Sequence, residues 1–313
     1  MSTNKNDITY NSVEEDNEDS LQPKHPITLT TTTTKNNNNN GSIKYKNDKR
    51  TLIHWFCLSG PLSVLFYALH DIIGGRNYPG YDWKRQAVSD LTAKDAPSFV
   101  VASSYSSIYG LFNGICCTLL CLLMEKSEKE RSDSKNGHGY GHGLIFRLGI
   151  YTFALMNFVS AIGYSLFPLT GSGYDGSFQS FVHVYIVTVA VVLLSIISLI
   201  LIAVGSFKGN EFGNGRGKDK DKDKDNGKES KEAFVEVENE NEIEILEREN
   251  QIRNRSKKCL GGLAILAFLF MMMGAIGSGL VPKRYFGVVE RWSTYSAVVF
   301  TGILGIYGFL RKL

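Results

Sequence analysis

The stretch "VTVAVVLLSIISLILIAV", residues 187–204, contains no charged side chain, and its only polar residues are one threonine and two serines. A helix needs roughly 20 predominantly apolar residues to cross the hydrocarbon core of a bilayer, which is about 30 Å thick. With its apolar flanks the stretch extends over Phe181–Gly205. The sequence therefore predicts a transmembrane helix at residues 181–205.

Further segments of similar length and composition occur on both sides of this one. They are Leu52–Ile73, Phe99–Met124, Phe146–Pro168, Leu260–Val281 and Trp292–Leu310. A soluble fold would have to hide several long, almost uncharged helices from water. We therefore predict an all-α, polytopic membrane protein with a bundle of six transmembrane helices. Helices 1–4 fall in residues 51–205, and helices 5–6 with a short tail fall in residues 259–313.

Two polar regions interrupt the apolar pattern. Residues 1–50 contain a threonine run and an asparagine run, and residues 206–258 contain "KDKDKDKD" and "EVENENEIEILEREN". Segments with so little apolar surface cannot offset the entropy of ordering the chain. We predict that residues 1–50 form a disordered N-terminal tail and that residues 206–258 form a disordered, charged loop.

The distribution of basic residues predicts the orientation. Lys44, Lys46, Lys49 and Arg50 precede the first span, and the 125–145 loop, the 206–258 loop and the Arg311-Lys312 tail lie on the same side. Loops rich in lysine and arginine remain in the cytoplasm. We expect both termini to be cytoplasmic. The span lengths fit the plasma membrane, the vacuole and the endoplasmic reticulum alike.

Polar residues collect at the opposite, extracytoplasmic ends of the predicted helices. His70 and Asp71 end the first span, and His183 lies about one turn into the fourth. An ionisable group inside a membrane bundle is costly, and such groups often mark functional sites. We therefore predict a polar cavity that opens to this side. Its candidate ligand-binding residues are Asp71, Arg85, Ser89, Asp90, Asn113, His183, Glu290 and Arg291.

Each of these residues also has a purely structural interpretation. His183 is suited to a hydrogen bond with a neighbouring helix, because buried polar groups need partners. Glu290 and Arg291 are suited to anchoring the chain at the membrane interface beside Trp292. Asp90 and Lys94 have the spacing of an ion pair on a short helix.

Motifs for other kinds of chemistry are absent from the sequence. It has no phosphate-binding glycine loop, no zinc spacing and no nucleophile elbow, so we predict no cofactor and no metal. The glycine-rich "GHGYGHG", residues 137–143, fails as a helix and predicts a flexible linker. The "KDKDKDKD" run balances its charges, so nucleic acid is not an expected partner.

Three stretches resemble the domain of unknown function 998 family of multi-pass membrane proteins. "NYPGYDWKRQAVSDLTAKDAPS" (77–98) is similar to its first-loop signature, a "PGY" followed by "AVSDL" or "AISEL". "LFPLTGSGYDGSFQSFVHV" (166–184) and "GVVERWSTY" (287–295) resemble its later motifs. The resemblance covers residues 52–310 except 206–258. The matching positions are Pro79, Gly80, Tyr81, Ser89, Asp90, Pro168, His183, Glu290 and Arg291.

The resemblance implies a six-helix fold with an extracytoplasmic signature, and it implies no activity. The asparagine and threonine runs and the long charged insertion resemble fungal members of the family. From the residues themselves we expect Pro61 to kink the first helix. We also expect a Pro79-Gly80 turn and then a short amphipathic helix. Trp83, Ala87, Val88 and Leu91 would lie on the membrane surface or cap the bundle.

Three functions fit these features. The first is a non-catalytic protein that binds or transports a small molecule or lipid through the polar cavity. The second is an intramembrane hydrolase or transferase that uses His183 with Ser89 or Asp90. The third is a structural or regulatory protein that recruits a cytoplasmic partner through residues 206–258. The expected partners are the lipid bilayer, a lipid or small-molecule ligand and a cytoplasmic protein, with no nucleic acid.

Overall fold

The computed structural model describes residues 51–133, 142–172, 174–208 and 232–311, all within one compact unit that spans residues 48–313. Every regular element in these ranges is helical, which confirms the predicted all-α fold. Among the described residues, six helical segments are long and apolar enough to cross a membrane. The protein is an integral membrane protein with multiple spans. The predicted disorder of residues 1–50 falls outside the described residues.

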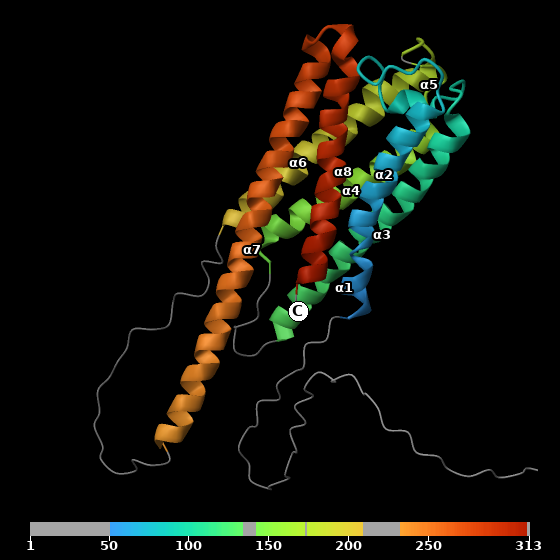
Figure 1. Cartoon of the computed structure of the whole chain (residues 1–313). Helices are drawn as coiled ribbons and strands as arrows, with labels where there is room; N and C mark the ends of the chain where they lie inside the picture. The colour runs from blue at the N-terminus through green and yellow to red at the C-terminus, as the bar shows by residue number, and fades with distance from the viewer. Residues whose placement is uncertain (1–50, 134–141, 173, 209–231, 312–313) are drawn as a thin grey trace, which may run out of the picture. The chain divides into compact units, whose positions relative to one another are not determined.

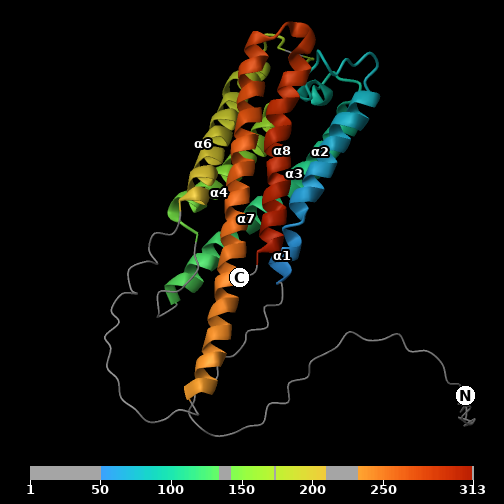
Figure 2. The same ribbon diagram turned by 60° about the vertical axis from the view of Figure 1, so that its left-hand side comes forward.

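The spans run alternately up and down the bundle (Figure 1). The elements are α1 (Leu52–Phe56), α2 (Ser59–Arg76), η1 (Ser89–Thr92), α3 (Phe99–Asp133), α4 (Leu144–Leu166), α5 (Phe178–Phe181), η2 (Val182–Val187), α6 (Thr188–Phe207), α7 (Glu232–Leu280), η4 (Lys283–Tyr285) and α8 (Phe286–Leu310). The connections 77–98, 167–177 and 281–285 all lie at one end, here called the η1 end (Figures 1 and 2). The opposite end is called the α1 end.

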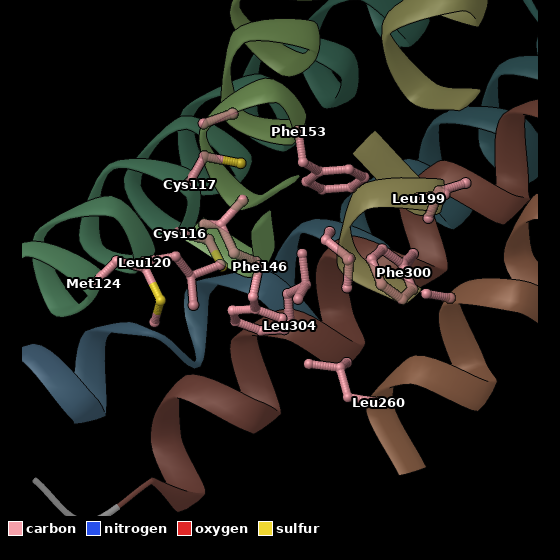
Figure 3. Close-up of a cluster of buried hydrophobic side chains, with 14 of the residues drawn as sticks. Cys116, Cys117, Leu120, Met124, Phe146, Phe153, Leu199, Leu260, Phe300 and Leu304 are labelled. Carbon is pink, nitrogen blue, oxygen red and sulfur yellow. The ribbon is translucent and has the colours of Figure 1, made fainter. Parts of the chain in front are cut away.

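The core of the bundle is apolar and closely packed. Helix α2 packs against α3 and α8, α4 packs against α6, and α7 packs against α6 and α8. Phe153 and Phe300 lie edge to face at the centre, with ring centroids 5.5 Å apart. The residues labelled in Figure 3 come from α3, α4, α6, α7 and α8. The hydrophobic effect does not drive helices together in lipid, so their association depends on close van der Waals packing. Small residues permit that close packing.

The first span is broken one turn before Pro61, as the sequence predicted. Helix α1 ends at Phe56 and α2 starts at Ser59. A proline has no N–H to donate and its ring clashes with the carbonyl four residues earlier, which here is that of Cys57. Helix α8 packs on this break at Gly305, where an added Cβ would lie 2.5 Å from the Cys57 oxygen. The proline thus places the break against Gly305 of α8.

The fourth span contains a π-helical turn that the sequence did not predict. Helices α5 and α6 are joined by η2, in which His183 lies. A π turn leaves one backbone carbonyl out of register, and such turns occur often at functional sites. Here the Thr188 hydroxyl donates to the His183 oxygen at 2.9 Å. The His183 oxygen therefore accepts from both the backbone N–H and the hydroxyl of Thr188.

The predicted charged loop is shorter than the 206–258 expected. Helix α6 continues to Phe207 and α7 begins at Glu232, so the expected disorder of residues 232–258 is wrong. Glutamate, arginine and leucine are good helix formers, and extending a helix from a membrane span avoids the cost of nucleation. Residues 209–231 lie outside the described residues.

The linker predicted at residues 137–143 ends in a buried histidine. His142 stacks on Phe146 with ring centroids 4.3 Å apart, and only 5% of its surface is exposed. Burial, followed by the charges of Arg311, Lys257, Arg253 and Arg147, lowers the pKa of His142 well below its ordinary value. His142 is therefore a neutral packing residue at the α1 end, and residues 137–141 of that linker fall outside the described ranges.

Candidate functional site

An ion pair between α2 and α8 lies at the centre of the η1 end. Arg291 Nε donates to Asp71 Oδ2 at 2.9 Å, and Nη2 donates to Oδ1 at 2.7 Å. The two side chains are only 10% and 13% exposed. This parallel pair of charge-assisted bonds fixes the geometry as well as the charge of both partners. Residues 220 positions apart in the sequence are thereby joined.

The same guanidinium binds the loop that follows α2. Arg291 Nη1 donates to the carbonyl oxygens of Trp83 at 2.8 Å and Gln86 at 3.0 Å. Its Nη2 donates to the Tyr81 hydroxyl at 2.6 Å. All three guanidinium nitrogens therefore have acceptors, and a planar fork of this kind suits several fixed acceptors at once. Arg291 holds the 81–87 loop against the start of α8.

Tyr81 continues this network. Its hydroxyl donates to the Ala87 oxygen at 2.9 Å while it accepts from Arg291. Burial, together with the carboxylates of Asp71 and Glu290, raises the pKa of Tyr81 well above its ordinary value, although Arg291 opposes this shift. Tyr81 therefore stays protonated and remains a donor to the loop.

The backbone of the loop also touches α8 directly at Gly287. The Gly287 N–H donates to the Lys84 oxygen at 2.9 Å. A Cβ at this position would lie 2.2 Å from the Gln86 oxygen and 2.5 Å from the Trp83 oxygen. Only glycine permits this approach. The two carbonyls that Arg291 binds are the same two that face Gly287.

Two carboxylates hold the next part of the loop. Glu290 Oε2 accepts from the Val88 N–H at 3.2 Å, and Asp90 Oδ2 accepts from the Ala87 N–H at 3.1 Å. Glu290 Oε1 has only a long contact of 3.5 Å with the Thr294 hydroxyl. Asp90 is 5% exposed, whereas Glu290 keeps more accessible surface. Glu290 is thus the carboxylate of this cluster with the most unused capacity to accept hydrogen bonds.

A group of aromatic rings lies beneath the ion pair. The Tyr67 ring meets those of Tyr109, Tyr295 and His70, with centroids 4.9, 5.2 and 5.6 Å apart respectively. The Tyr295 hydroxyl donates to Asp71 at 3.1 Å. His70 is 4% exposed, and neither of its ring nitrogens has a hydrogen-bond partner among the described residues. A buried polar group without a partner is rare and requires an explanation.

Two candidate residues lie in separate networks. His183 Nδ1 bonds the Phe167 oxygen at 2.7 Å, and its ring lies 4.7 Å from that of Tyr164. Asn113 donates to Asn157 at 2.7 Å, which joins α3 to α4. Both arrangements match the structural interpretation of buried polar groups bonded between helices. The sequence alone could not distinguish this from a ligand site.

The loop itself differs from the predicted amphipathic helix. Its only regular element in the described region is the single 3-10 turn η1. Ala87, Val88 and Leu91 are buried and cap the bundle, whereas Trp83 is 52% exposed. The hydrogen bonds to α8 described above replace those that a helix would make internally. The Pro79-Gly80 turn is present, with Gly80 at a φ of 77°.

The two remaining candidates, Arg85 and Ser89, form no side-chain hydrogen bond with the described residues of the cluster. The Arg85 side chain is exposed and forms no hydrogen bond or ion pair with another described residue. Ser89 accepts at its backbone oxygen from Thr92 at 3.1 Å. In the described part of the chain no hydrogen bond joins Ser89 to His183. The structure therefore brings together Asp71, the 81–90 loop, Glu290 and Arg291.

Comparison with known proteins identifies a family for part of the chain. Residues 61–215 match the family described as "Protein of unknown function (DUF998)". No curated protein and no solved structure matches the chain. The matched region runs from Pro61 in α2 past the end of α6, so it includes the 77–98 loop and His183. Through residues 61–215 the chain belongs to the DUF998 family, a family of proteins of unknown function.

Proposed function

We propose that this protein binds or transports a small molecule or lipid through the polar cluster at the η1 end. The observation that carries the proposal is that both ring nitrogens of His70 are buried and lack a hydrogen-bond partner among the described residues. A buried imidazole with no partner costs about 1–3 kcal/mol, and a bound polar group that supplies a partner removes that cost. His70 lies beside the Tyr67 ring and next to Asp71 in the chain, at the end of the first span where the sequence pattern collects polar residues.

The residues of the cluster divide into two roles. Arg291 and Asp71 use their polar atoms on each other and on the loop, so they act as the fixed frame. Glu290 keeps one oxygen with a single long contact, which suits a ligand hydroxyl, amine or proton. Asp90 and His183 lie farther along the same end and are proposed to contact a larger ligand.

Conservative changes at His70 and Glu290 provide the test. The variants His70→Phe and Glu290→Gln keep size and packing while they remove the imidazole nitrogens or the charge. We expect each variant to weaken binding or transport of the ligand at least about tenfold, because a hydrogen bond to a charged group contributes about 1.5–3 kcal/mol. Untargeted lipid and metabolite profiles of cells carrying each variant should then match those of cells that lack the protein.

The matched control for that experiment is Arg85→Gln, a change at an exposed residue of the same loop. It should leave the profiles at their wild-type values. Amounts of each variant in the membrane are measured in parallel, so that loss of the protein is separated from loss of binding. Wild-type profiles for both His70→Phe and Glu290→Gln, at normal amounts, would reject the proposal.

We place the η1 end on the extracytoplasmic side, with both termini in the cytoplasm, because the basic loops lie at the α1 end. Two cysteines test this orientation. Native Cys259 is exposed near the α1 end, and a Lys94→Cys variant adds an exposed cysteine at the η1 end. In sealed cells or organelles, an impermeant maleimide should label Lys94→Cys from outside the cytoplasm and Cys259 only from the cytoplasmic side. Reversed labelling would invert the assignment.

A regulatory function is the second candidate. Helix α7 begins at Glu232, well before its membrane span at Arg248–Leu280, and residues 232–247, which continue the helix beyond the span, are proposed to recruit a cytoplasmic partner. A variant that lacks residues 209–240 leaves the described α6 and the α7 span intact. If this variant reproduces the loss of the protein while Glu290→Gln does not, the regulatory function is favoured. No hydrogen bond in the described chain supports the hydrolase, which needs Ser89 within reach of His183.

A further inference from the structure

An apolar groove of about 700 Å³ lies between α6 and α7 toward the α1 end. This volume falls within the range of about 300–1,000 Å³ that is typical of ligand sites. Helix α6 contributes Ile200 and Val204, and α7 contributes Ile265 and Leu269. Lys208, the residue after α6, is the one charged residue of the lining. The groove is far from the polar cluster at the η1 end.

The groove faces outward into the membrane. Ile200, Val204 and Leu269 are 44%, 48% and 51% exposed. They belong to the membrane spans Phe178–Phe207 and Arg248–Leu280. Hydrocarbon rather than water therefore fills the groove, and Lys208 lies at the level where the span ends.

A second lysine lies at the same end of the groove. Lys258, Gly262, Ile265 and Leu269 follow one another at spacings of four, three and four, so they share one face of α7. The preceding residue of that turn, Gly261, lies against the end of α6, because its added Cβ would be 2.7 Å from the Ser206 Cβ. Lys258 and Lys208 are both exposed. Lys208 thus lines the groove at its α1 end, and Lys258 lies on the same face of α7 as Ile265, about two turns nearer the α1 end.

Gly262 keeps the space below the lysines open. A Cβ added there would meet no atom within 4 Å. Glycine at this position leaves room between an outward-facing apolar channel and the two ammonium groups. The combination of an apolar channel and paired cations complements an amphiphile that has a long chain and an anionic head.

We infer that this groove binds an anionic phospholipid, with an acyl chain along Val204 and Ile265 and the phosphate between Lys208 and Lys258. Burial of each methylene group favours the chain, and lysines near a membrane surface attract anionic lipid heads. A free phosphate would make no use of the apolar lining. The bilayer of the same leaflet supplies the lipid directly. This site is independent of the function proposed for the η1 end.

The test measures which lipid the full-length protein retains. The protein is placed in nanodiscs that contain equal amounts of phosphatidylserine and phosphatidylcholine, transferred to detergent, and analysed by native mass spectrometry. Wild type should retain phosphatidylserine in clear preference. Changing both lysines (K208A/K258A) should lower that preference about thirtyfold, from the attraction expected of two surface lysines. Val204→Trp should reduce retention by filling the groove while both lysines remain.

The matched control replaces two exposed lysines of the η1 end (K94A/K283A) and should retain phosphatidylserine as wild type does. Equal retention of the two lipids by wild type overturns the inference. So does unchanged retention in K208A/K258A. If the lysine variant loses the lipid but Val204→Trp keeps it, the headgroup binds without the groove, and the site as proposed is also rejected. A lipid-free dimer would show that a second copy covers the groove instead.

Discussion

Replacing Arg291 with methionine should lower the free energy of unfolding by about 3–5 kcal/mol, because it leaves a buried carboxylate without its cation. Arg291→Met also removes the donors to the Trp83 and Gln86 carbonyls, which are then without their charged partner. Asp71 would keep only the Tyr295 hydroxyl among its described donors. Purified protein in mixed micelles, unfolded by increasing dodecyl sulfate, gives the measurement.

A double-mutant cycle identifies the ion pair as the cause. Adding Asp71→Asn to Arg291→Met removes the unpaired charge, so the double variant should regain about 1–3 kcal/mol over the sum of the two single changes. Arg291→Lys should still be strongly destabilising, because an ammonium cannot form the parallel pair of bonds and reach the loop carbonyls as well. Arg284→Met, at an exposed arginine just before α8, is the control and should have little effect. Strict additivity in the cycle would contradict the assigned role.

The parts of the fold that depend on composition were predictable from the sequence. Crossing a bilayer requires long apolar helices, so each span could be recognised from its own residues. The break at Pro61 was predictable for the same reason, since a proline acts on its own helix. The π turn at Val182–Val187 was not, because it depends on how α4 and α6 pack: a Cβ at Gly163 would lie 2.7 Å from Val187.

The candidate site was predictable as a location and not as an arrangement. Polar residues near the ends of spans indicated the end of the bundle at which Asp71, the 81–90 loop and Arg291 come together, because intramembrane charge is expensive wherever it occurs. Which partners they choose depends on tertiary contacts between α2, the 77–98 loop and α8. Arg85 and Arg291 are equally charged in the sequence, yet one is exposed and the other bonds Asp71. His70 was part of the polar set, but only its packing reveals that both ring nitrogens lack partners.

The residues that the resemblance singled out are therefore largely explained by structure, although the family match covers only residues 61–215. Tyr81, Asp90, Glu290 and Arg291 all bond the loop backbone or one another, so their shared purpose is to close the η1 end of the bundle. Such a frame is rigid, which is what a binding site on a membrane protein needs to hold ligand groups in place. The two features that the frame does not use are the open side of Glu290 and the imidazole of His70. A ligand bound there would supply the hydrogen-bond partners that these two groups lack among the described residues.

Gly287→Ala should be the most damaging change that adds only one methyl group, with an expected loss of about 3 kcal/mol of unfolding free energy. The new Cβ would fall 2.2 Å from the Gln86 oxygen and 2.5 Å from the Trp83 oxygen. Both contacts are backbone atoms, so no side chain can turn aside, and the loop itself must move. That movement also withdraws the two carbonyls from Arg291. The loss should exceed the gain of about 1 kcal/mol that alanine brings to a helix.

Gly110→Ala separates these two effects. Gly110 lies within α3, and an added Cβ there meets nothing within 4 Å, so only the helix-forming gain applies. The variant should be as stable as wild type or slightly more stable. If Gly287→Ala behaves in the same way, the loop does not pack against α8, and the closed η1 end described above is not the state of the protein in the membrane. If only Gly287→Ala loses stability, and Arg291→Met in that background adds little, the glycine and the arginine act on one and the same contact.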